Sequence, residues 1–174
     1  MKRVQLFKML TLCVFLSIPM LGLTQKCIDT IPASTATQHY RINSNGTVSD
    51  NKNKLMWIPC SAGQEWSNGQ CLGVARNMTW NDALQEANQS RFGKFSDWRL
   101  PTIHELSRIT ELQCQQPAIN LKFFPNTKPM DYWTVTTFVN NSDLAWRVHF
   151  GFGENHTAKK SAPAAVRLVR SSGQ

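Results

Sequence analysis

The period of the hydrophobic positions predicts two helices in the middle of the chain. Residues 79–92 have one apolar face with a 3.6-residue period, formed by Trp80, Ala83, Leu84 and Ala87. Thr79 and Asp82 provide a helix start in front of that face. Residues 102–112 predict a second helix, because Thr102 and Glu105 have the spacing of a capping box; its buried stripe is Ile103, Leu106 and Ile109.

A period of two residues predicts strands on both sides of these helices. Tyr40 and Ile42 alternate before an Asn45–Gly46 turn, and a second short run ends at residues 55–57, which is typical of a hairpin. Residues 132–138 alternate again. Residues 145–152 place one set of side chains on one face, Trp146, Val148, Phe150 and Phe152, and Arg147 and His149 on the other.

The order of these elements predicts an α+β domain. The last segment, residues 165–170, would complete the late antiparallel sheet with Val166 and Leu168 facing inward. A length of 174 residues suits one domain. Since 41% of the residues are hydrophobic and only 17% are charged, a disordered chain is excluded.

Residues 1–24 predict a secretory signal peptide. Three basic residues precede the apolar run LTLCVFLSIPMLGL, which is shorter than the roughly 20 residues that span a membrane. An uncleaved membrane anchor is the alternative. After cleavage we expect an extended segment at 25–38, a domain at 39–170, a tail at 171–174 and no transmembrane span, in a protein that is secreted, periplasmic or on a bacterial cell surface.

The cysteine count favours disulfides in the exported chain. Removal of the leader takes away one of five cysteines, and the remaining four lack the C-x-x-C spacing of a zinc site. Three pairings are possible. Cys60 and Cys71 bracket a polar, glycine-containing stretch that can loop back, which leaves Cys27 to pair with Cys114.

The net charge suggests an anionic partner. It is +8 for the whole chain and +5 once three basic leader residues are removed. The candidate polyanion-binding residues lie in the C-terminal half: Lys122, Lys128, Lys159, Lys160, Arg167 and Arg170. Only Lys159 and Lys160 are adjacent, so an ordinary solvated surface is the alternative. Export and the absence of a binding motif argue against nucleic acid.

Catalytic motifs are not recognisable in the sequence. His104 and Glu105 form half of an H-E-x-x-H zinc motif, but Arg108 stands where the second histidine is required. We find no nucleophile elbow, phosphate-binding glycine loop or dinucleotide fingerprint. The expectation is a non-enzymatic protein with no catalytic residue, metal or cofactor.

Several stretches together resemble one family. They occur in the order GTVSDNKNKLMW, CSAGQEWSNGQCLG, MTWNDALQEAN, SDWRLPTIHEL, CQQPAIN, FFPNT, YWTVT, AWRVHFGFG and AVRLVR. In this order and spacing they are similar to the Lcl C-terminal domain family (Lcl for Legionella collagen-like) of exported bacterial proteins, formerly a domain of unknown function. The resemblance extends from about His39 to Arg170.

The resemblance implies a compact fold like that of C-type lectins and formylglycine-generating enzymes, with two helices on twisted antiparallel strands. It also implies the Cys60–Cys71 loop and a bond from Cys114 to an N-terminal cysteine. Its recurrent residues are expected to be structural: Trp57, Trp80, Trp98, Arg99, Leu100, Pro101, Trp133 and Trp146. In namesake members this domain is linked to adhesion and to binding of sulfated polysaccharides.

This chain departs from the relatives' patterns in three ways. It has no collagen-like repeat, no late cysteine pair like that of the formylglycine-generating enzymes, and no calcium-dependent sugar motif after Gln116 and Pro117. We therefore expect an adhesion or binding module for an anionic, glycosaminoglycan-like polysaccharide or a cell-surface protein. The alternatives are a structural or accessory subunit of an envelope or pilus assembly and, less favoured, an enzyme with an unrecognised site.

Overall fold

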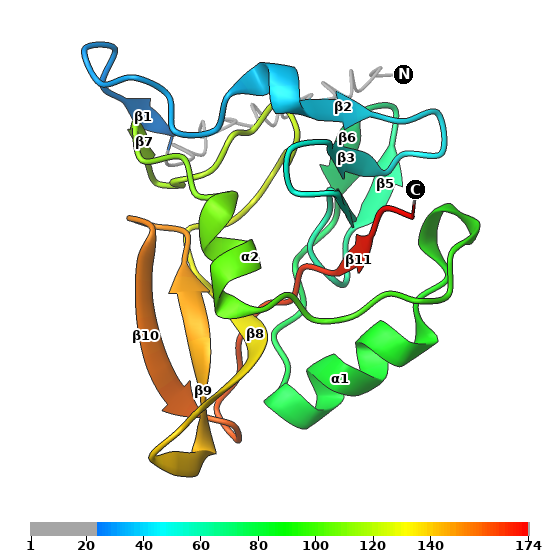
Figure 1. Ribbon diagram of the computed structural model, residues 1–174, viewed down its shortest axis with the longest axis vertical. Helices are drawn as coiled ribbons and strands as arrows, with labels where there is room; N and C mark the ends of the chain where they lie inside the picture. The colour runs from blue at the N-terminus through cyan, green and yellow to red at the C-terminus, as the bar shows by residue number, and fades with distance from the viewer. Residues whose placement is uncertain (1–23, 174) are drawn as a thin grey trace, which may run out of the picture.

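The computed structural model describes residues 24–173, and the signal-peptide prediction concerns residues that lie almost entirely outside this range. Mostly antiparallel strands and two α-helices make up the described chain (Figure 1). The helices are α1 (Trp80–Gln89) and α2 (Ile103–Arg108), with short 3-10 turns η1 (Thr37–His39) and η2 (Phe92–Lys94). The predicted α+β class is confirmed.

The first half of the chain forms most of a four-stranded sheet. Its strand order is β11 (Val169–Ser171), β4 (Leu55–Trp57), β3 (Val48–Asp50) and β2 (Tyr40–Ile42). The expected turn at Asn45–Gly46 joins β2 to β3, and Gly46 has a φ of 82°, which suits glycine. A second turn then leads to β4, so the predicted hairpin is the start of a three-strand meander.

The second half forms a three-stranded sheet in the order β10 (Glu154–Lys159), β9 (Asn141–His149) and β8 (Asp131–Phe138). The expectation that residues 165–170 complete this sheet was wrong. Its third strand is β10, whose polar sequence gave no strand signal, whereas β11 pairs with β4 in the other sheet. Phe152 was predicted to share a face with Val148 and Phe150, but it lies beyond the end of β9 and is 53% exposed, whereas those two are buried.

The helix starts agree with the prediction, but both helices end early. Thr79 caps α1 and accepts a hydrogen bond from the Asp82 backbone N–H, and Thr102 caps α2 through a complete capping box. The C-cap of α1 is Ser90, whose backbone is extended, and α2 stops at Ile109 because Thr110 forms a bridge with Ile119. Long-range pairing therefore ends the second helix.

The β8–β9 hairpin separates two hydrophobic clusters. Tyr132 and Trp133 are both 0% exposed and point to opposite faces of β8. Tyr132 packs with Leu106 and other residues on the α2 side, whereas Trp133 packs with Ala83 on the α1 side. The two clusters thus lie on opposite faces of β8, and α2 packs directly on the hairpin on its side.

Two disulfides tie the outer segments to these layers. Cys27 bonds Cys114 and joins β1 (Lys26–Cys27) to β7 (Cys114–Gln115). Cys60 bonds Cys71 and closes the hairpin of β5 (Glu65–Ser67) and β6 (Gln70–Leu72). Both predicted pairs are confirmed. Residues 24–173 contain no helix that is both long and apolar enough to cross a membrane.

Candidate functional site

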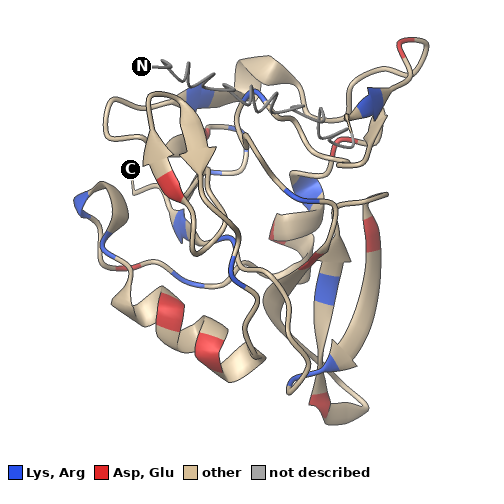
Figure 2. Ribbon diagram, turned by 180° about the vertical axis from the view of Figure 1, so that it is seen from behind, with Lys and Arg blue, Asp and Glu red and all other residues tan. Residues whose placement is uncertain are grey.

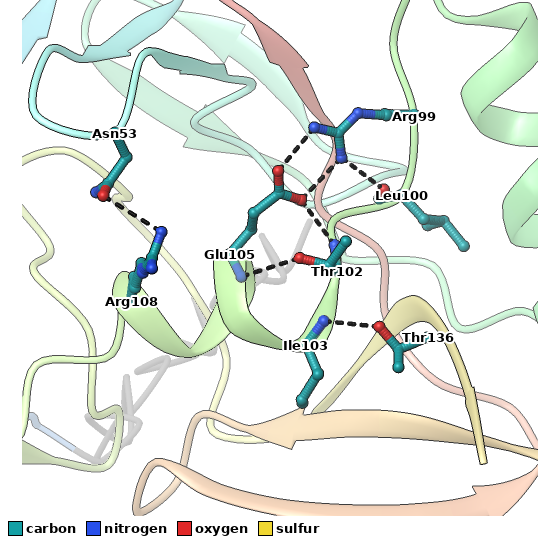
Figure 3. Close-up of polar contacts among 8 residues, drawn as sticks. All are labelled: Asn53, Arg99, Leu100, Thr102, Ile103, Glu105, Arg108 and Thr136. Carbon is teal, nitrogen blue, oxygen red and sulfur yellow. Dashed lines mark hydrogen bonds and ion pairs between the residues drawn. The ribbon is translucent and has the colours of Figure 1, made fainter. Parts of the chain in front are cut away.

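The segment SDWRLPTIHEL forms a polar network at the start of α2 (Figure 3). Arg99 donates two hydrogen bonds to the Glu105 carboxylate, at 2.8 and 2.7 Å. Glu105 also accepts from the Thr102 backbone N–H at 2.8 Å, and the Thr102 hydroxyl accepts from the Glu105 backbone N–H at 3.2 Å. Arg99 therefore orients the capping carboxylate, and part of the expected contact with backbone carbonyls is present in its bond to Leu100 O.

The electrostatics of the network are those of a structural pair. Burial by itself would raise the pKa of Glu105, but hydrogen bonds from Arg99 and Thr102 outweigh it, so the pKa lies below its ordinary value. The hydrogen bond to Glu105 raises the pKa of Arg99. Both groups stay charged and pair with each other, which stabilises the start of α2.

The network predicts an acid-sensitive contribution to stability. Replacement of Glu105 by glutamine keeps a capping side chain but removes the ion pair, and we expect a loss of about 1 kcal/mol in the free energy of unfolding at neutral pH. The expected loss of stability is small because the Arg99 side chain is 40% exposed and water screens the ion pair. Since the folded-state pKa is lowered, the wild-type contribution is complete above the unfolded pKa and is lost as the pH falls through the folded value.

Urea unfolding at a series of pH values tests this expectation. The gap between wild type and Glu105→Gln should shrink below about pH 4. Glu65→Gln, at an exposed carboxylate on β5, is the matched control and should track the wild type. A gap for Glu105→Gln that persists unchanged into acid would contradict the assigned role of its charge.

The other recurrent residues are mainly core residues. Trp57 and Trp133 are fully buried, and Trp98 and Leu100 are almost so. Pro101 is buried as well, and Trp80 and Trp146 are half-buried. The Trp80 indole N–H donates to Thr134 O at 2.9 Å, which fixes this ring of the first α1 residue against β8.

Arg167 is not part of a polyanion-binding surface, which corrects the sequence prediction. Its side chain is 0% exposed and donates to the carbonyls of Ile58 and Pro59 and to the Thr127 hydroxyl. The guanidinium lies over the Phe124 ring, 4.8 Å from its centroid. Burial lowers the pKa of Arg167.

Three of the remaining candidate cations are dispersed. Arg170 is half-buried, donates to Asp97 at 2.6 Å and lies over Phe95, so its charge is already compensated. Lys122 and Lys128 are exposed on the loop that leads to β8, and the Lys122 ammonium is 5.7 Å from the Phe123 ring centroid. Figure 2 shows basic residues spread over several elements rather than gathered on one face.

Lys159 and Lys160 do lie together, at the edge of an open hollow of about 580 Å³. The Lys160 ammonium is held 4.2 Å from the Trp80 ring centroid, which places a fixed cation beside an aromatic face. The other lining residues come from α1, the β8–β9 hairpin and the chain after β10: Thr79, Asn81, Asn141, Asp143, Leu144 and Ser161. Amides, hydroxyls and two cations opposite one carboxylate suit an anionic ligand rich in hydroxyl groups.

A second hollow of about 570 Å³ contains two cations that the sequence analysis missed. Lys52 and Arg108 line it, and Arg108 donates to Asn53 at 3.4 Å (Figure 3). Asp50 lines it as well. Burial raises the pKa of the Tyr40 hydroxyl there, and the charges of Asp50 and Glu111 raise it further. The hollow beside Lys159 and Lys160 is named here the lysine hollow, and we prefer it as the anion site because an aromatic ring holds one of its two cations in place.

Two kinds of reactive group, a metal-ligand cluster and a free thiol, are absent from residues 24–173. Within residues 24–173, no group of three or more histidine, cysteine, aspartate or glutamate side chains is placed to hold a metal ion. The four cysteines of this range are all in disulfides, so none supplies a thiolate.

These features define a disulfide-bonded α+β domain with a basic surface hollow. The family model of the Lcl C-terminal domain matches residues 46–170, most of the chain. The protein therefore belongs to the Lcl C-terminal domain family, as the sequence resemblance implied. No curated protein matches the chain.

Proposed function

We propose that this protein is a non-enzymatic binding module of the bacterial cell exterior and that the lysine hollow recognises an anionic polysaccharide. The observation that carries the proposal is the Lys159–Lys160 pair beside Trp80 at the edge of an open, amide-lined hollow. Cations bind sulfate or carboxylate groups, the Trp80 ring holds one of these cations in place, and amides bond to hydroxyls.

Two further observations support a binding role outside the cytoplasm. The two disulfides are typical of an oxidising, extracytoplasmic compartment. Adhesion is the role linked to namesake members of the family to which the chain belongs. From the same family membership we also propose that the strands have a C-type lectin-like arrangement.

Retention on immobilised heparin, a sulfated polysaccharide, tests the site. We expect the double variant Lys159→Gln/Lys160→Gln to elute at lower salt, with roughly tenfold weaker binding at fixed ionic strength. Lys54→Gln/Lys94→Gln loses the same charge from exposed positions outside both hollows and is the matched control. It should elute close to the wild type.

Two outcomes would contradict the proposal. Equal shifts for both double variants would mean that only net charge matters and that the lysine hollow is not a site. Elution of the wild type together with an unrelated protein of equal charge would remove polysaccharide recognition altogether.

A further inference from the structure

The outer edge of β10 is unusually open. β10 is the last strand of its sheet, and no other element lies beyond it in the two opposite views (Figures 1 and 2). Its register with β9 continues over six residue pairs without a shift. A strand edge of this kind presents backbone donors and acceptors to another chain.

The ladder shows which backbone groups point outward. Lys160 N donates to Asp143 O at 2.8 Å, and this pair continues the β9–β10 register. Because bonded and non-bonded pairs alternate in an antiparallel ladder, His156 and Ala158 bond β9. The N–H and C=O groups of Asn155 and Thr157 then point away from the sheet, as does the N–H of Lys159.

Other segments of the fold cover the β8 edge of this sheet and leave the β10 edge open. On β8, Trp133 N donates to Ala165 O at 3.0 Å and Val135 N donates to Pro101 O at 2.8 Å, so that edge is covered. On β10, none of the backbone hydrogen bonds of residues 24–173 outside the ladders involves Asn155 or Thr157. β10 also has no proline, no bulge and only one terminal lysine, the features that commonly protect an edge.

We propose that a second copy of this chain binds the β10 edge, antiparallel and about a two-fold axis at Thr157. Outward-pointing residues must face outward-pointing residues, so Thr157 meets Thr157 and Asn155 meets Lys159 of the second copy. Glu154 then lies opposite Lys160 of the second copy, whose ammonium lies over its own Trp80 ring, and symmetry brings these unlike charges near each other twice.

The charges at the two ends of β10 favour a second copy of this chain as the partner, and they favour this register. A shift by two residues in either direction removes the Glu154–Lys160 pair, and in one direction it places His156 opposite His156. In the proposed register, Glu154 of one copy faces Lys160 of the other at both ends of the paired strands. The association joins two three-stranded sheets into one continuous sheet, and because a strand edge is small, the dimer is expected to be weak.

Sedimentation velocity of the exported chain over a wide concentration range tests the association. We expect a reversible monomer–dimer equilibrium. Thr157→Pro removes an outward N–H without loss of a ladder bond, and it should weaken the dimer by about tenfold or more. Backbone amide exchange should slow at Asn155 and Thr157 as the protein is concentrated.

A charge exchange provides the second, fold-preserving measurement. Glu154→Lys alone and Lys160→Glu alone should each weaken the dimer, whereas the double exchange should restore it. Lys54→Glu, at an exposed lysine remote from β10 in the sequence, is the control and should leave the equilibrium unchanged. The heparin experiment uses dilute, monomeric protein, so its result is independent of this one.

The outcomes are decisive in either direction. A chain that stays monomeric at all concentrations overturns the proposal and leaves the edge to a strand of another protein. A dimer that is indifferent to Thr157→Pro, or one that the double charge exchange fails to restore, forms through another surface and overturns it as well.

Discussion

Replacement of Arg167 by alanine is expected to lower the free energy of unfolding by about 3–5 kcal/mol. The side chain is 0% exposed, so truncation leaves a large cavity between Phe124, Tyr132 and the chain before β5. It also removes the donors to Ile58 O, Pro59 O and the Thr127 hydroxyl. Buried acceptors without a donor add to the cost of the lost packing.

Arg167→Met separates the two contributions. Methionine fills much of the volume and carries no charge that must be desolvated, so we expect a smaller loss than for alanine. The remaining loss measures the unsatisfied acceptors. Chemical denaturation of both variants gives these values, with Arg41→Ala as the control because Arg41 is exposed on β2 and should change stability by less than about 0.5 kcal/mol. A loss below about 1 kcal/mol for Arg167→Ala would show that Arg167 does not support the core.

Arg167 also shows where sequence patterns stop being informative. It alternates with Val166 and Leu168, and this pattern assigns it to a solvent face. Val166 and Leu168 pack in the α1-side cluster, whereas Val169 packs in the α2-side cluster, so this segment passes between two packed layers. Alternation predicts which side chains share a face, but it does not predict that both faces are covered.

Local chemistry explains the parts of the fold that were predictable. The helix starts depend on hydroxyl and carboxylate groups three residues apart, at Thr79 with Asp82 and at Thr102 with Glu105. The Asn45–Gly46 turn depends on a positive φ that glycine adopts easily. Each signal lies within a few residues of the structure it specifies.

Distant partners decide the parts that were not predictable. The sequence of β10, ENHTAK, has little alternation, and it is a strand because β9 lies beside it. In the lysine hollow, adjacency in the sequence revealed Lys159 and Lys160, but Asn81 and Asn141 come from other elements. Only the folded chain brings those amides to the lysines.

Removal of the Cys27–Cys114 disulfide is expected to lower the free energy of unfolding by about 4–5 kcal/mol. The bond closes a loop with a sequence separation of 87, which restricts the unfolded chain far more than the folded one. Cys27 is exposed and Cys114 only half-buried, so Cys27→Ala/Cys114→Ala disturbs little packing. The loss therefore measures mainly the entropy of the unfolded state.

The denaturant dependence tests this origin of the effect. Without the long cross-link the unfolded chain expands and exposes more surface, so the m-value in urea should increase. Cys60→Ala/Cys71→Ala is the contrast, since that bond has a sequence separation of 11 and both sulfurs are buried. It should lose about 3 kcal/mol of loop entropy plus packing energy, with little change in m. If Cys27→Ala/Cys114→Ala loses stability at an unchanged m-value, the Cys27–Cys114 bond acts on the folded state instead. It would then do so by holding the segment before Tyr40 in place, where Ser34 and Thr35 bind the Glu111 carboxylate.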